Sequence, residues 1–203
     1  MKNDTQKSWE KFLNPESLRS NIKLISLFIC IFEMFKDGMI EKPRMLFANM
    51  ERFDVEQGEI VYEVSDGYKK EVLSKSKYLD EATLIWFKDN DGIDDVDIEK
   101  YHKIRKYRNE LTHNMVEFLT LHNKEFDENI LNDLIDLYSK IEKWWFKYFE
   151  LSIQPEILPD GADPDEVIPG PMLTIRLMLE IALGAEPTEG FYYKEFMKIF
   201  KSS

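Results

Sequence analysis

The sequence has few of the residues that build disulfide frameworks and metal sites. Its 203 residues include a single cysteine, Cys30, and three histidines, His102, His113 and His122. One cysteine forms no intrachain disulfide, which favours a reducing, cytoplasmic setting. The histidines are eleven and nine residues apart, too far for a short-range chelate, and no cysteine pair supports zinc. We therefore expect no bound metal.

Long apolar runs and targeting segments are also missing. The longest apolar stretch, Leu24 to Phe35, is interrupted by Glu33, so it predicts a buried core helix and no membrane span. The N-terminus lacks the apolar segment and small residues of a signal peptide. No Gly-rich phosphate loop, Walker pattern or nucleophile elbow is present, so we expect no cofactor.

Positive charge is scarce. Lys and Arg total 27 against 39 Asp and Glu, for a net charge of −12. Such a field repels polyanions at long range and excludes broad coating of DNA or RNA, but a small basic patch could hold a nucleotide or a short RNA. The acidic run around Gly92 predicts a helix cap, because a calcium loop aligned on Gly92 would have Phe87 and Ile98 where carboxylates are required.

Helical periodicity is what the chain has in abundance, and it predicts an all-α, up-and-down helical bundle. The expected helices cover residues 15–37, 41–53, 69–88, 97–122, 128–151, 172–183 and 190–201, the first ending at Asp37-Gly38. Alternating Ile60, Tyr62 and Val64, followed by Ser65-Asp66-Gly67, predict one small β-hairpin near 59–68.

The sequence pattern predicts three parts of the chain. We expect residues 1–153 to form the helical domain, residues 154–171 a Pro-rich acidic linker, and residues 172–203 a helical extension that packs on the bundle. The aromatic run Trp144 to Phe149 points around the whole helix. Core or dimer packing is therefore favoured over base stacking.

The segment from Tyr101 to Asn114 reverses the charge locally. Five basic residues and no acidic one lie between Lys100 and Arg108, so this is where we expect an anion. On a helix, the segment has a core face and an opposite polar face. The core face carries Ile104, Tyr107, Leu111, Met115 and Phe118; the polar face carries His102, Lys106, Asn109 and His113, with Arg105 at its edge.

The motif Arg108-Asn109-Glu110-Leu111-Thr112-His113 resembles the signature of the HEPN superfamily, an Arg, a polar residue and a His four to six residues after the Arg. The likeness covers roughly residues 15–150. These helical domains include many RNA-cleaving toxins and defence proteins. The resemblance implies a metal-independent endoribonuclease of the toxin or phage-defence kind, with an antitoxin protein as an expected partner. Its implied catalytic set is Arg108, Asn109 and His113. The resemblance also implies a homodimer with two motifs facing each other across a cleft.

The residue types suit that chemistry. A His near neutral pKa exchanges protons, an Arg supplies fixed charge to phosphate oxygens, and Asn109 can orient the imidazole. His102, Arg105 and Lys106 would bind substrate, an inference from their placement alone. Arg108 and His113 lie about 140° apart on an ideal helix, so one straight helix does not aim both at one phosphate.

A second hypothesis keeps the fold without the catalysis. The chain would then be a helical interaction or nucleotide-binding protein. Its net negative charge favours this second hypothesis, because a ribonuclease would profit from a more positive field. The intact Arg-Asn-x-x-x-His motif favours the first.

Overall fold

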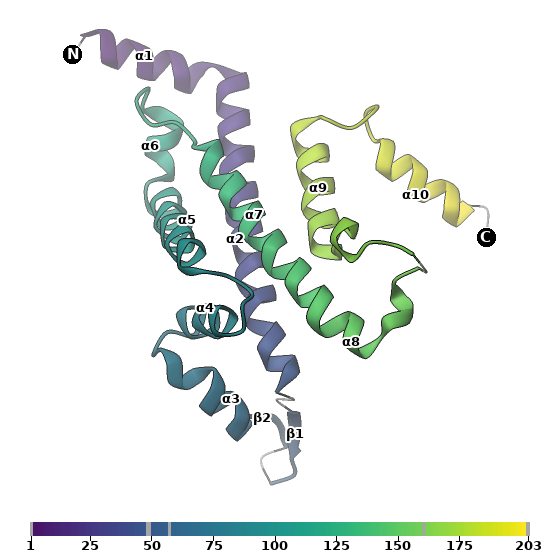
Figure 1. Cartoon of the computed structure of the whole chain (residues 1–203). Helices are drawn as coiled ribbons and strands as arrows, with labels where there is room; N and C mark the ends of the chain where they lie inside the picture. The colour runs from purple at the N-terminus through teal and green to yellow at the C-terminus, as the bar shows by residue number, and fades with distance from the viewer. Residues whose placement is uncertain (1, 48–49, 57, 160, 202–203) are drawn as a thin grey trace.

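The computed structural model describes residues 2–47, 50–56, 58–159 and 161–201, and it shows a helical bundle built around one long helix. This helix, α2 (Pro15–Leu46), runs through the middle of the molecule (Figure 1). Asn14 caps it by accepting hydrogen bonds from the backbone N–H groups of Glu16 and Ser17 at 3.0 and 3.3 Å. Asn14 also marks the bend from the preceding helix, α1 (Lys2–Leu13). The all-α prediction is confirmed.

Helix α2 is longer than predicted. The expected end at Asp37-Gly38 and the separate short helix after it are wrong, because α2 continues to Leu46 with Pro43 inside it. Gly38 serves close packing instead of capping. A Cβ atom at Gly38 would lie 2.8 Å from the Tyr138 hydroxyl oxygen, well inside contact distance.

A two-stranded antiparallel hairpin follows α2. Strands β1 (Met50–Asp54) and β2 (Glu59–Glu63) pair with Met50 opposite Glu63. The predicted hairpin near 59–68 is therefore right about strand 59–63 and wrong about its turn. Ser65 is the N-cap of α3 (Asp66–Glu71), and its hydroxyl accepts a hydrogen bond from the Tyr68 N–H at 3.1 Å.

Two predicted helices are divided in the structure. The expected helix 69–88 becomes α3, the 3₁₀ turn η1 (Leu73–Lys75) and α4 (Leu79–Asp89). The expected helix 97–122 becomes α5 (Asp95–His113) and α6 (Met115–Thr120), separated at Asn114. The acidic cap is confirmed: Asp94 and Asp97 form a reciprocal capping box at the start of α5.

The rest of the chain runs through α7 (Glu128–Trp145) into short turns and two final helices. The turns are the π-helical η2 (Phe146–Glu150), α8 (Leu151–Ile153), η3 (Pro155–Ile157) and η4 (Pro164–Glu166). Helix α9 (Gly170–Leu183) packs on the bundle, whereas α10 (Phe191–Lys201) extends away from it (Figure 1).

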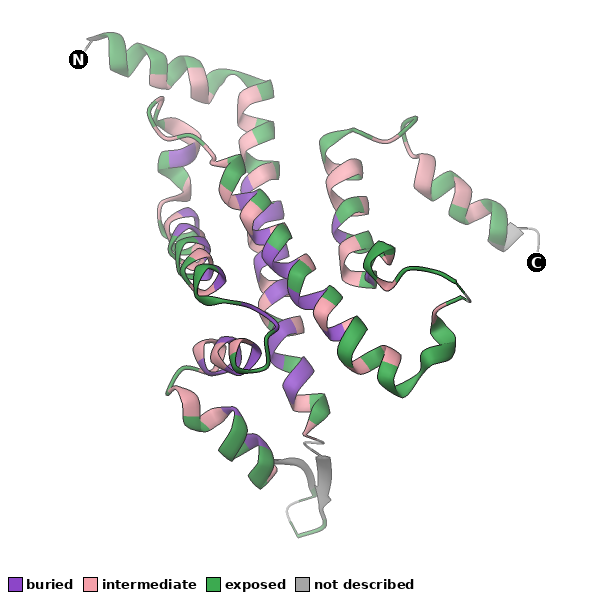
Figure 2. Cartoon of the chain, in the orientation of Figure 1, coloured by how far each residue is buried: buried purple, intermediate pink, exposed green. Residues whose placement is uncertain are grey.

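The core lies where α2, α4, α5 and α7 meet (Figure 2). Its fully buried side chains include Phe28, Phe35, Phe87, Tyr101, Ile104, Leu111 and Leu134. One ion pair is buried with them: Lys42 Nζ of α2 lies 2.7 Å from Glu142 Oε1 of α7. Within the described ranges, no helix is both long and apolar enough to cross a membrane.

Candidate functional site

Helix α5 carries the motif on its solvent side. His102, Lys106, Asn109 and His113 are all exposed, while Ile104, Tyr107 and Leu111 of the opposite face are buried. The capping box fixes where the helix begins, and the buried face fixes its rotation. The polar face is thereby open to a ligand along its whole length.

Arg108 does not lie on that exposed face but reaches across to α2. It forms an ion pair with Glu33, and its guanidinium lies 5.6 Å from the centre of the Phe32 ring. A second guanidinium nitrogen donates to Asn109 Oδ1 at 3.3 Å. Two residues of the predicted catalytic set, Arg108 and Asn109, are therefore in contact.

Glu33 is held in its charged form. Partial burial works to raise the pKa of this carboxyl, but hydrogen bonds from Lys36 and Arg108 outweigh burial and keep the pKa below its ordinary value. An ionised Glu33 fixes the Arg108 guanidinium between α2 and α5. The Arg108 side chain remains 28% exposed, so one edge of it is accessible.

His113 is at the last position of α5 and is exposed. Within the described part of the chain, its imidazole makes no hydrogen bond or ion pair. No contact joins it to Arg108, in keeping with the 140° that separates the two positions on a helix. A single chain thus presents the Arg and the His in different directions.

The basic character of the segment is weaker in the structure than in the sequence. Arg105, predicted to bind substrate, faces two carboxylates of α4, Asp80 at 3.3 Å and Glu81 at 3.5 Å. Lys100 lies 3.4 Å from Asp133 of α7. Among the described residues, Lys103 and Lys106 make no ion pair. These two lysines supply the unneutralised charge near the motif.

His102, also predicted to bind substrate, lies apart from the catalytic set. It borders a small hollow of about 160 Å³ with Glu81, Leu84, Ile85 and Ile98. Its ring centre is 5.9 Å from that of Tyr101. The Tyr101 hydroxyl donates to Asp80 at 2.6 Å, and burial together with this carboxylate raises the pKa of the phenol. This part of α5 is fastened to α4.

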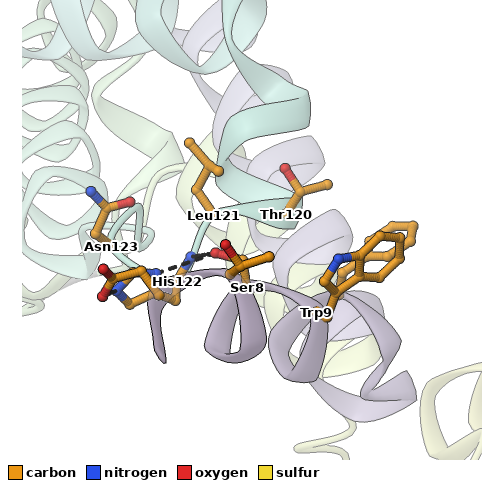
Figure 3. A pocket seen from close by; sticks show the side chains of 9 residues that line it. Ser8, Trp9, Thr120, Leu121, His122 and Asn123 are labelled. Carbon is orange, nitrogen blue, oxygen red and sulfur yellow. Dashed lines mark hydrogen bonds and ion pairs between the residues drawn. The ribbon is translucent and has the colours of Figure 1, made fainter. Parts of the chain in front are cut away.

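A larger cavity, which was not predicted, lies beyond the C-terminal end of α6. Its volume is about 720 Å³, and it is lined by residues of α1 and of the segment 120–123 (Figure 3). Ser8 Oγ lies 3.2 Å from His122 Nδ1 and accepts the His122 backbone N–H at 3.2 Å. The spacing of Trp9, Phe12 and Leu13 before the cap at Asn14 was the available signal for α1.

In the residues that the structure describes, no group of three or more His, Cys, Asp or Glu side chains could hold a metal ion. No protein-family model, no curated protein and no solved structure matches the chain significantly.

Proposed function

We propose that the protein is a metal-independent endoribonuclease that acts as a homodimer through Arg108, Asn109 and His113. The observation that carries the proposal is the arrangement of the motif on α5. His113 and Asn109 are exposed on one face, and Arg108 touches Asn109 while an ionised Glu33 holds its guanidinium. An accessible imidazole and a fixed cation are the two groups that metal-free phosphodiester cleavage needs, and the motif carries both.

The reaction uses the RNA's own 2′-hydroxyl as nucleophile. A base takes the 2′-hydroxyl proton, the 2′-oxygen attacks phosphorus, and the bond from phosphorus to the 5′-oxygen breaks as an acid protonates the leaving oxygen. The products are a 2′,3′-cyclic phosphate and a 5′-hydroxyl. His113 exchanges the protons, because an imidazole changes charge near neutral pH. Arg108 neutralises the charge that develops on the phosphate oxygens.

A second copy of the chain completes the site. Because Arg108 turns toward α2 and His113 faces solvent, one chain does not direct both at one phosphate. Two α5 helices related by a two-fold axis place the motif of each chain opposite that of the other. Such a pair also supplies two imidazoles, one as base and one as acid. Lys103 and Lys106 of each chain would contact the RNA backbone.

The test measures cleavage of a mixed-sequence RNA by the purified protein in EDTA. We expect cyclic-phosphate ends, and His113→Ala should lower the rate by at least about 100-fold, the range for losing a positioned acid or base. His102→Ala is the matched control, since His102 is exposed on the same helix but lies by the α4 hollow, and it should lower the rate much less. Metal-dependent cleavage, or a fully active His113→Ala, would contradict the proposal.

The oligomeric state is tested by mass in solution and by mixing variants. We expect a dimer at micromolar concentration, and mixed Arg108→Ala and His113→Ala chains should recover part of the activity that each lacks alone. A monomeric enzyme that cleaves RNA would contradict the composite site.

A toxin or phage-defence role, with or without a protein antitoxin, predicts that expression slows growth and that His113→Ala relieves it.

The second candidate is a non-catalytic protein that binds RNA or a nucleotide. It is favoured by the neutralisation of Lys100, Arg105 and Arg108 by carboxylates, which leaves little free charge for catalysis. The same cleavage assay separates the two candidates. Binding of RNA without any cleavage by folded protein would establish the second.

A further inference from the structure

We propose that the cavity between α1 and residues 120–123 binds one nucleoside unit of a single-stranded RNA, with the base on Trp9 and the ribose hydroxyls at the opposite, acidic end. The inference rests on the proposed function for its ligand, since it makes this cavity a substrate subsite. No residue of the Arg-Asn-x-x-x-His motif is among the residues that line this cavity.

The apolar end of the cavity presents an aromatic surface to solvent. Trp9 is 58% exposed, an unusual degree of exposure for the largest apolar side chain. Phe12 supports it edge-on, with ring centres 6.1 Å apart. Exposed aromatic rings are the surfaces on which proteins stack unpaired bases. The volume of about 720 Å³ lies in the range of small-ligand sites.

The other end is polar. Asp4, His122 and Asn123 line it, and Figure 3 shows His122 and Asn123 across the cavity from Trp9. No Lys or Arg is among the described residues that line the cavity, so a phosphate would not be favoured there. A carboxylate accepts hydrogen bonds from ribose hydroxyls, as acidic residues do in dinucleotide-binding sites. The arrangement therefore selects a ribose over a deoxyribose.

The polar end is built rigidly. Ser8 Oγ accepts the backbone N–H of His122 and lies 3.2 Å from its Nδ1. Lys11 donates to the backbone carbonyl oxygens of Leu121 and Lys124. These bonds fasten α1 to the segment that follows α6 and hold the two walls at a fixed separation.

Ser8, His122 and Asp4 are the residue types of a serine-hydrolase catalytic triad, but their geometry does not fit that chemistry. The Asp4 carboxylate lies 3.6 Å from His122 Nε2, beyond hydrogen-bond distance, and the serine oxygen already accepts a backbone N–H. The set holds the loop and leaves the cavity for a ligand.

The cavity is placed to receive the same strand as the motif. Helix α6 leads from the end of the motif to the cavity, and its six residues span roughly 9 Å. A short single strand could therefore reach from the scissile phosphate to Trp9. Recognition of an unpaired base would then fix which bond is cut.

The experiment measures the affinity of a fluorescein-labelled ribo-oligonucleotide for the full-length His113→Ala protein, which should not cleave it. The deoxyribo-oligonucleotide of the same sequence is the second probe. We expect tighter binding of the ribo form. Adding Trp9→Ala should weaken it roughly 5- to 150-fold, as loss of one stacked base does. Adding Asp4→Asn should reduce the preference for ribose.

Tyr148→Ala is the matched control, because Tyr148 is an aromatic residue with the same 58% exposure and lies outside the cavity. Tyr148→Ala should leave both affinities unchanged. Trp9→Phe keeps an aromatic ring and should retain most of the binding, which separates the loss of stacking from a disturbance of α1. Equal affinity for both probes, no measurable RNA binding, or full affinity in Trp9→Ala would overturn the inference. If the wild-type protein binds RNA through Trp9 but never cleaves it, the subsite is supported and the proposed nuclease function is contradicted.

Discussion

At the scale of single residues, the buried ion pair between Lys42 and Glu142 is the most exacting feature of the core. The two side chains are 9% and 5% exposed, and the Lys42 ammonium also lies 5.6 Å from the centre of the Trp145 ring. Burial raises the pKa of Glu142, while the charge and hydrogen bond of Lys42 act to lower it. The carboxylate therefore depends on one cation.

Lys42→Met should destabilise the protein by about 3–5 kcal/mol at neutral pH, because it leaves a buried carboxylate without its partner. The loss should shrink in acid. Without Lys42 the pKa of Glu142 in the folded state rises further above its ordinary 4.5, so the folded state binds a proton more readily than the unfolded state. Stability is then regained as the pH falls through that raised pKa.

Urea unfolding at several pH values measures both effects. The control is Lys42→Met combined with Glu142→Leu, which removes both charges and should cost much less than Lys42→Met alone. A cost for Lys42→Met that stays constant from neutral to acidic pH would show that Glu142 is not its cause.

For single residues of the site, exposure could be predicted from the sequence, but contact partners could not. The exposure of His113, Asn109 and Lys106 followed from their position on a helix whose other face is apolar. The partner of Arg108 did not, because Glu33 is 75 residues earlier in the chain and no local pattern connects them. Charge counted along the sequence overstated the basic patch for this reason.

At the scale of elements, the start of α5 was predicted more closely than the end of α2. The start of α5 was predicted to within two residues, at 97 against Asp95, because Asp94 and Asp97 form a capping box with their own backbone. The predicted end of α2 was wrong because Gly38, a residue that often ends helices, here lies inside α2 and makes room for the Tyr138 side chain of α7. A glycine that ends a helix and one that admits a neighbour look alike in sequence. Tertiary contact decides between them.

Gly38→Ala should therefore destabilise the protein by about 1–2 kcal/mol, even though alanine is the better helix former by about 1 kcal/mol. The added methyl group would lie 2.8 Å from the hydroxyl oxygen of Tyr138, a buried side chain whose hydroxyl donates to the Met34 carbonyl at 3.2 Å. Thermal or urea unfolding measures the loss.

Tyr138→Phe provides the control, since it removes the hydroxyl and leaves ring atoms 3.6 Å from the added methyl group, an ordinary contact. In that background Gly38→Ala should be neutral or stabilising. If it costs the same in both backgrounds, the close approach to Tyr138 is not what requires glycine.

At the scale of the whole molecule, the two C-terminal helices differ in their relation to the bundle. Ile175 of α9 is 2% exposed and belongs to the core, whereas Ile181 of the same helix is 52% exposed. Helix α10 is joined to α9 by the hydrogen bond from the Tyr192 hydroxyl to Glu180 and shows Tyr193 to solvent. The core of the protein thus reaches past the Pro-rich segment and ends within α9.

Ile175→Ala should cost about 2–5 kcal/mol of unfolding free energy, as other large-to-small core substitutions do. Ile181→Ala, the same change in the same helix, should cost less than about 0.5 kcal/mol. Urea unfolding of both variants makes the comparison. Equal losses would mean that α9 buries a different face from the one described.

The central position of α2 has a consequence for the protein's synthesis. Helix α2 ends at Leu46 and its partner α7 ends at Trp145, so about 100 residues must be translated after α2 before α7 is complete. At ~5–20 residues per second, this interval lasts roughly 5–20 s. Until α7 is made, Phe35 of α2 lacks the Tyr138 ring that packs against it in the folded protein. We expect the incomplete chain to expose apolar surface of α2 during this interval, a state that favours aggregation.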